Sequence, residues 1–386
     1  MTGKTLRRTL SLNTLALIAP LALFLSFAVL SCHDDDGSPE ESDPRVGIVY
    51  DTVGKGDGSF NDSAYGGMKR AQEELGAVVS EETTDGTESN REKLLQSLAD
   101  DNDLVIAVGF SFENSIKKVA AVNPDTNFAG IDILQRGDSP TNFASLVFNE
   151  AEGSFLVGVA AALKSETGKV GFIGGVCGTP DRLIEKFEAG FISGVLAMVK
   201  GINKNMEVET SYLSQFSDPQ NPDGPPDISG FFNPEGAKAA AEGMFSGGSD
   251  IVFHAAGSSG AGLFEAAREF SSQEDNSKVW AIGVDSDQYG TSDESVREYI
   301  LTSMLKRVDT AVYNIIRAQR DDEFSGGTVN HDLANDGVGY ATSGGFVDDI
   351  RELIEGPKAF IVRDLFDVPT VPFKDCREPQ TYNLRY

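Results

Sequence analysis

Residues 45–75 read RVGIVYDTVGKGDGSFNDSAYGGMKRAQEEL, and this stretch decides the fold class. It begins with a short apolar run, 46–50, that ends at Asp51 and a glycine-rich turn. From Ser63 to Leu75 small and apolar residues recur at spacings of three and four, which predicts a helix with one buried face. An apolar strand, a glycine-rich turn and an amphipathic helix together form the repeating unit of parallel α/β sheets.

The same alternation continues along the chain, and its strands are uninterrupted apolar runs, which indicates a parallel sheet covered by helices on both faces. The pattern breaks near 145–150, and the strand–helix units are too many for one sheet. We therefore predict two doubly wound α/β lobes with a ligand cleft between them. The predicted strands after the first are 104–108, 127–132, 169–174, 206–213, 250–255 and 278–285, and the further helices are 91–100, 113–122, 150–164, 181–200, 235–245 and 260–270.

Length and composition narrow the class of protein. A chain of 386 residues predicts two or three domains. Its net charge of -28, with 60 acidic and 32 basic side chains and no basic cluster, excludes a nucleic-acid-binding protein, because such proteins bind phosphates with Lys and Arg. Three Cys and three His, far apart in sequence, match no zinc or iron–sulfur spacing. We expect no metal and no cofactor.

The N-terminus predicts an exported lipoprotein. A basic segment containing Lys4, Arg7 and Arg8 precedes the largely apolar run 10–30, which is the order found in signal peptides. A permanent transmembrane anchor is the alternative, since about 20 apolar residues can span a bilayer. The run ends in Val29-Leu30-Ser31-Cys32, which resembles a bacterial lipobox, so we expect removal of residues 1–31 and lipidation of Cys32. Whether export follows the Sec or the twin-arginine route stays open.

Residues 32–44 are acidic and carry no apolar residue able to pack, which predicts a disordered tether between the lipid and the folded body. Two cysteines then remain, Cys177 and Cys376. In an exported protein they either form a disulfide or stay as two buried thiols, and the sequence leaves both open.

The turn after the first strand carries the most chemical information, because ligands bind at the carboxyl ends of strands in this architecture. Its glycines, Gly54, Gly56 and Gly58, lack the spacing of a dinucleotide-binding loop, and no Gly-Lys-Ser/Thr follows them as a triphosphate loop requires. The turn instead places Phe60 beside Asn61 just before the helix. An aromatic face beside a hydrogen-bonding amide suits a flat polar ring.

Three other segments bear on the site. The segment from Asp285 resembles the start of a calcium loop, but Tyr289 and Val296 stand at ligand positions, which excludes calcium. His254 either lines the cleft or is a core or hinge-side residue. The proline-rich segment 217–234 predicts a surface excursion of the second lobe.

Residues 51–66 and a series of further motifs resemble the basic membrane protein family of bacterial substrate-binding lipoproteins. The resemblance extends over nearly all of 45–355. The motifs, in order, are IAVGF (106–110), NEAEGSF (149–155), GKVGFIGG (168–175), FEAGF (187–191), HAAG (254–257), IGVDSDQ (282–288), SMLKRVD (303–309), GVGY (337–340) and GGF (344–346).

The resemblance implies a type I periplasmic-binding-protein fold and a nucleoside ligand, purine in the characterised branch, that is delivered to an ABC permease. It also implies a set of binding residues. Phe60 and Phe253 would form an aromatic clamp on the base, Asn61 and Asp132 would bind the base edge, Asp285 would accept the ribose hydroxyls with Lys306 balancing its charge, and Asp51 and Gly257 would complete the lining.

We therefore expect a monomeric, non-catalytic binding protein, held by lipid at the outer face of the cell membrane, or on the periplasmic side in a Gram-negative cell. The alternatives are a nucleoside hydrolase, a sensor or adhesin with the same pocket, and a different small ligand such as a sugar. The expected division is lobe 1 at 45–147 plus about 285–320, lobe 2 at 148–284 plus about 321–363, and a C-terminal tail at 364–386.

Overall fold

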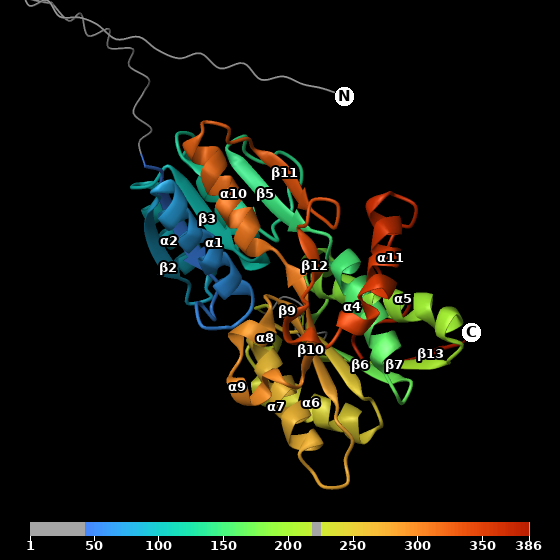
Figure 1. The fold of residues 1–386 in the computed structure, drawn as a ribbon. Helices are drawn as coiled ribbons and strands as arrows, with labels where there is room; N and C mark the ends of the chain where they lie inside the picture. The colour runs from blue at the N-terminus through green and yellow to red at the C-terminus, as the bar shows by residue number, and fades with distance from the viewer. Residues whose placement is uncertain (1–42, 218–224, 386) are drawn as a thin grey trace, which may run out of the picture. The chain divides into compact units, whose positions relative to one another are not determined.

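The computed structural model describes residues 43–217 and 225–385 (Figure 1). The expected signal peptide, Cys32 and nearly all of the expected tether lie outside these residues. Within the described residues, no helix is both long and apolar enough to cross a membrane.

The first sheet has six strands, all parallel, in the order β11-β5-β4-β3-β1-β2. Its central strand β3 is an apolar run buried throughout, and β4 is buried from its second residue onward, as predicted for a sheet covered on both faces. The strands are β1 Arg45–Tyr50, β2 Val78–Thr83, β3 Leu104–Val108, β4 Asn127–Ile131, β5 Phe143–Phe148 and β11 Gly327–His331. The helices connecting or covering them are α1 Phe60–Leu75, α2 Glu88–Ala99, α3 Glu113–Val122 and α10 Val308–Arg320.

The second sheet has the order β12-β10-β9-β8-β6-β7-β13, with a parallel centre and an antiparallel strand at each edge. Its strands are β6 Lys169–Cys177, β7 Met206–Gln215, β8 Ile251–Ala255, β9 Trp280–Asp285, β10 Ile300–Lys306, β12 Val338–Tyr340 and β13 Gln380–Leu384. Its helices are α4 Glu150–Lys164, α5 Leu183–Ile202, α6 Pro234–Ser246, α7 Gly260–Ser271, α8 Gln288–Thr291, α9 Glu294–Arg297 and α11 Arg351–Val362.

The chain passes between the sheets three times, and two passages differ from the expected division. β10 pairs with β9 in the second sheet, although 285–320 was expected in lobe 1. Only α10 returns to the first sheet, where the Asp309 amide donates to Ser63 Oγ of α1 at 3.1 Å. β11 then pairs with β5 of the first sheet, beside which it lies in Figure 1, although 321–363 was expected in lobe 2. Strand pairing, which local sequence does not encode, decides both assignments.

Helices α4 and α5 pack closely because glycines line their contact. A Cβ added at Gly190 or Gly194 of α5 would lie closer than 3.0 Å to the carbonyl oxygen of Ala151 or Phe155 on α4, and Gly158 faces the Phe191 carbonyl in the same way. Each obstacle is backbone, which cannot rotate aside. The approach of these two helices therefore requires glycine at each position.

We expect Gly194→Ala to lower the free energy of unfolding by about 1–3 kcal/mol, because the added methyl forces two helix backbones apart. Gly243→Ala is the matched control, since Gly243 is also helical and its Cβ would meet nothing within 4 Å. That control is expected to gain up to about 1 kcal/mol from helix propensity. Urea denaturation measures both, and equal effects of the two substitutions would contradict the close-packing explanation.

Candidate ligand-binding site

A cavity with about 710 Å³ of space not filled by atoms, part of it open to solvent, lies at the carboxyl ends of strands from both sheets. Lining residues follow β1, β3 and β4 in the first sheet and β8 in the second, or lie at the ends of β9 and β10 and at the start of α5. Ligands bind at this edge of parallel sheets.

All of the expected binding residues except one line this cavity: Asp51, Phe60, Asn61, Asp132, Gly257, Asp285 and Lys306. The exception is Phe253, and placing it in the cleft was wrong. Its side chain on β8 is fully buried and packs against Phe172 and Phe191, with ring centroids 5.6 and 5.4 Å away. It belongs to the core between the second sheet and α5.

From the segments of the second sheet, Phe231 contributes an aromatic ring to the cavity wall, and sequence reasoning missed it. The turn after β8 holds it in place: Ser258 Oγ donates to the Phe231 carbonyl, and Ser259 Oγ to the Gly230 carbonyl, both at 2.8 Å. Phe231 lies in the segment 217–234 that was predicted to be a surface excursion. The end of that segment, with Ile228 and Phe231, instead lines the cavity.

Two more aromatic rings line the cavity, Phe110 after β3 and Phe187 on α5. Phe110 packs edge-on against Phe231 at a centroid distance of 6.3 Å. Phe110 ends the motif IAVGF and Phe187 begins the motif FEAGF, both quoted above. Their place in these motifs was the sequence signal that could have identified them as lining residues. The cavity thus has aromatic walls from the segments of both sheets.

The glycine-rich turn is organised by Asp57, whose carboxylate accepts hydrogen bonds from the amides of Ser59, Asn61 and Asp62 at 2.8–3.1 Å. These amides belong to the first turn of α1 and the residue before it, so Asp57 satisfies N–H groups that the helix cannot pair internally. Gly54, Gly56 and Gly58 all have positive φ, which explains the glycines of the turn without a phosphate. Phe60 is thereby placed at the start of α1, facing the cavity.

Asn61 was expected to bind the base edge, but the hydrogen bonds of its side chain are made within the protein. Its Nδ2 donates to Asp51 Oδ1 at 2.9 Å and to Asp57 Oδ2 at 3.0 Å, while its Oδ1 accepts from the Asp51 amide at 3.3 Å. Both amide hydrogens are therefore committed to carboxylates of the protein. Asn61 orients Asp51, whose carboxylate faces the ligand space.

Asp132 and Asp285 occupy matching places in the two sheets. Asp132 follows β4 with φ 60° and Asp285 ends β9 with φ 62°, and both residues line the cavity. This left-handed conformation is unfavourable for most residues, and Asp tolerates it better than most. Strain of this kind is characteristic of functional sites, where it directs a side chain into the site.

Lys306 is buried between carboxylates and aromatic rings. Its Nζ lies 2.7 Å from Asp132 Oδ2 and 3.1 Å from Glu150 Oε1, and 5.4 Å from the centre of the Phe60 ring. It was expected to balance Asp285, but its direct partners are Asp132 and Glu150. Burial lowers the pKa of Lys306, and the carboxylates of Asp132, Glu150 and Asp285 outweigh it and raise that pKa, so the lysine stays charged. Sequence reasoning missed Glu150.

Carboxylate oxygens remain available to a ligand. Burial raises the pKa of Asp285 to about 6 against the opposing effects of Lys306 and of Ser59, whose Oγ donates to Oδ2 at 2.6 Å. Burial likewise raises the pKa of Asp51 to about 6. Asp132 Oδ1 is buried without a hydrogen-bond partner among the described residues. The cavity therefore offers acceptors between aromatic walls, and its lysine is already paired.

His254 is a core residue, one of the two alternatives that the sequence left open. It is fully buried, its Nε2 lies 2.9 Å from Gln288 Oε1, and burial lowers its pKa to about 4. Gln288 in turn donates to the Gly58 carbonyl at 3.2 Å. His254 thus contacts the glycine-rich turn indirectly, through Gln288.

Two doubly wound sheets that share a polar and aromatic cavity at their strand ends define a solute-binding protein with the type I periplasmic-binding fold. A structure described as an ABC transporter solute-binding protein from Aeropyrum pernix K1 matches with a TM-score of 0.71 and 26% identity, covering 86% of this chain and 94% of that one. The chain belongs to the Bmp family, described as PnrA-like ABC transporter substrate-binding proteins, whose family model matches residues 45–223 and 226–358.

Relatives agree with this assignment. A CD4+ T-cell-stimulating antigen of Listeria monocytogenes is 33% identical, over 86% of this chain and 89% of its own length. The ABC transporter nucleoside-binding protein BmpA of Lactococcus lactis is 29% identical, over 94% of this chain and 99% of its own length. Membership implies a ligand, a permease partner and a location outside the cytoplasm. The protein captures a solute for transport and is not an enzyme.

Proposed function

We propose that this protein binds a nucleoside, with the base between Phe60 and Phe231 and the ribose at Asp285, and that it delivers this ligand to an ABC permease. The observation that carries the proposal is the pairing of aromatic walls with buried carboxylates, of which Asp132 Oδ1 has no hydrogen-bond partner among the described residues. A nucleoside offers a flat ring for stacking and several N–H and O–H donors, and it carries no charge. The name of the Lactococcus relative supports the same ligand class.

The electrostatics favour a nucleoside over a nucleotide. Asp51, Asp132 and Asp285 line the cavity, and Lys306, the single basic residue among the described lining residues, is paired with Asp132 and Glu150. A phosphate would meet these carboxylates in a partly desolvated space, where like charges repel strongly. We therefore expect neutral nucleosides to bind and their monophosphates to be rejected.

Calorimetric titration of the protein lacking residues 1–32 tests the proposal. Adenosine, guanosine, inosine and a pyrimidine nucleoside are compared with their monophosphates and with free ribose. The expected result is one-to-one binding of at least one nucleoside, recovered chemically unchanged, and loss of that binding in Phe60→Ala. Phe360→Ala is the matched control, because Phe360 on α11 is 58% exposed and outside the cavity lining. Binding of ribose or another sugar alone would contradict the nucleoside assignment.

We also propose that the protein is a monomer anchored outside the cell membrane by lipid on Cys32. Cys32→Ala is expected to abolish labelling by a radioactive fatty acid and to leave an unprocessed or released protein. Ser31→Ala is the matched control, since a small residue is retained before the cysteine and processing should continue. Labelled, membrane-bound protein from the Cys32→Ala gene would refute lipidation at this residue.

A further inference from the structure

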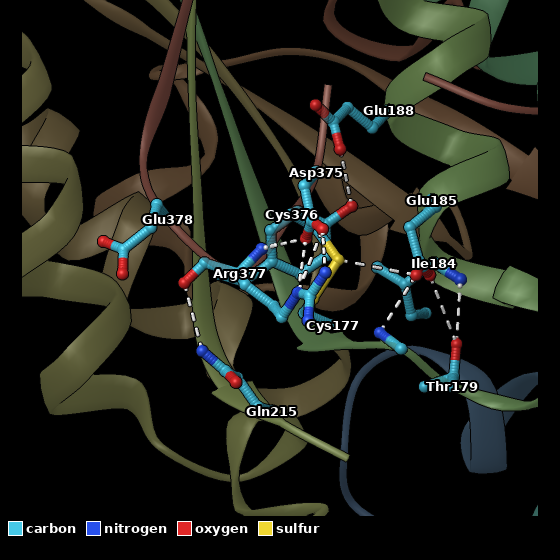
Figure 2. The surroundings of a disulfide bond; sticks show 12 residues. Cys177, Thr179, Ile184, Glu185, Glu188, Gln215, Asp375, Cys376, Arg377 and Glu378 are labelled. Atoms are coloured by element: carbon cyan, nitrogen blue, oxygen red, sulfur yellow. Dashed lines mark hydrogen bonds and ion pairs between the residues drawn. A yellow bond between two sulfur atoms is a disulfide. The ribbon is translucent and has the colours of Figure 1, made fainter. Parts of the chain in front are cut away.

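The C-terminal residues 374–384, here called the C-terminal strap, attach to the second sheet along β7 and, through Cys376, at the carboxyl end of β6, which is the end that carries the cavity. β13 pairs antiparallel with β7, with Tyr382 opposite Val208. Cys376 forms a disulfide with Cys177, the last residue of β6, across a sequence separation of 199 (Figure 2). This resolves the alternative that the sequence left open, in favour of the disulfide.

The strap contacts the helix that lines the cavity. Leu183, Ile184 and Phe187 of α5 face the ligand space. Glu185 and Glu188, buried to 4% and 0% exposure on the same helix, are the residues next to the strap. Tyr382 Oη donates to Glu188 Oε1 at 3.1 Å, with Tyr212 donating to the other oxygen at 2.7 Å.

Glu185 connects the disulfide to the turn that starts α5. Its Oε1 lies 3.5 Å from Cys376 Sγ and accepts the Gly178 amide at 2.9 Å. Figure 2 shows Glu185 and Thr179 beside the sulfur–sulfur bond. A contact with the disulfide sulfur and a hydrogen bond from the turn thus converge on one buried carboxylate.

That turn is conformationally strained. Asp181 and Arg182 are consecutive non-glycine residues with φ 56° and 52°, directly before Leu183. Such conformations persist only where the surroundings enforce them. The described contacts around this turn include the disulfide at Cys177, the hydrogen bond from the Gly178 amide to Glu185, the ion pairs of Asp181 with Lys186 and Arg136, and the helix that follows.

We infer that the Cys177–Cys376 disulfide and the strap are positioning elements of the binding site: they hold the 178–182 turn and the first turns of α5 so that Leu183, Ile184 and Phe187 stay against the ligand. Releasing the strap lets the strained turn relax and moves one wall of the cavity. The effect on affinity rests on the proposed nucleoside ligand, whereas the effect on the turn does not.

The test uses the protein lacking residues 1–32 and compares wild type with the double variant Cys177→Ser/Cys376→Ser. Hydrogen exchange of amides 178–188 is expected to accelerate about tenfold or more, since the free energy of local opening becomes smaller. The dissociation constant for adenosine, measured well below the unfolding midpoint, is expected to rise about tenfold. A merely structural disulfide would lower the unfolding midpoint and leave this dissociation constant unchanged.

Two single variants sharpen the result. Tyr382→Phe removes the bond to Glu188 while keeping the disulfide and should accelerate exchange mainly at 185–188. Asn383→Ala, at an exposed position of the same strand, should change nothing. Unchanged exchange at 178–188 in the double variant would overturn the inference, and so would faster exchange with unchanged adenosine affinity. If the wild type binds none of the nucleosides named above, the nucleoside proposal fails, and the exchange data alone decide the positioning role. If it binds one other than adenosine, that nucleoside replaces adenosine in the affinity comparison.

Discussion

Lys306→Met is expected to lower the free energy of unfolding at pH 7.5 by about 3–5 kcal/mol, which is the cost of removing one partner from a buried ion pair. The side chains of Lys306, Asp132 and Glu150 are 2%, 4% and 1% exposed. Without the ammonium group, two carboxylates would share a dry site with no cation to offset their desolvation.

The stability lost in Lys306→Met should be smaller at low pH than at pH 7.5. Burial already raises the pKa of Glu150 against the opposing effect of Lys306, and removing the lysine raises it further. A carboxyl group whose folded pKa is raised stabilises the fold fully below its unfolded pKa, and that contribution is lost as pH rises through the folded pKa. The deficit of Lys306→Met relative to wild type should therefore shrink as the pH is lowered from 7.5 towards 4.5.

Urea denaturation across this pH range measures the effect, with Lys169→Met as the matched control. Lys169 pairs with Glu207 at 3.0 Å, but the two side chains are 44% and 32% exposed. An exposed pair contributes at most about 1 kcal/mol, so this control should lose little at any pH. A second substitution, Glu150→Gln, should restore part of the stability of Lys306→Met. If Lys306→Met and Lys169→Met lowered the free energy of unfolding by small and equal amounts, the buried charge cluster would not be a source of stability.

The second large effect concerns how affinity is divided between base and ribose. We expect a 2′-deoxynucleoside to bind about tenfold more weakly than its ribonucleoside, because a missing hydroxyl leaves a buried charged acceptor unpaired at a cost of about 1–3 kcal/mol. Asp285 lines the cavity, and Ser59 Oγ donates to its Oδ2 at 2.6 Å. We expect its Oδ1 to accept the ribose hydroxyl.

The variants separate the two contributions. Asp285→Ala should remove most of the difference between ribo- and deoxynucleoside, whereas Phe60→Ala and Phe231→Ala should weaken both ligands alike, since stacking does not sense the sugar. Calorimetric titration of the wild type and these three variants, each with the ribonucleoside and the 2′-deoxynucleoside, gives the ratio of the two dissociation constants for each protein. Equal affinities for the two ligands in the wild type would remove Asp285 from the sugar site.

The sequence predicted the site well where one local segment carries the chemistry. Residues 51–61 supply Asp51, Phe60 and Asn61 from one strand end, one turn and one helix start, and all three line the cavity. The sequence-based prediction was wrong for the aromatic residue on the opposite side of the cavity. Phe253 lies in β8 and Phe231 lies in the proline-rich segment between β7 and β8. Only the packed structure shows that Phe253 is buried in the core and that the proline-rich segment returns to bring Phe231 to the cavity.

By itself, then, the sequence determined the α/β class, the family and the strand-end carboxylates, because apolar periodicity and short motifs are local properties of the chain. Tertiary structure alone decided that β10 joins the second sheet, that Lys306 pairs with Asp132 and Glu150, and that Cys376 bonds to Cys177. Each of these links joins segments that are far apart along the chain. Their pairing depends on strand register and on desolvation inside the packed protein, which no single segment specifies.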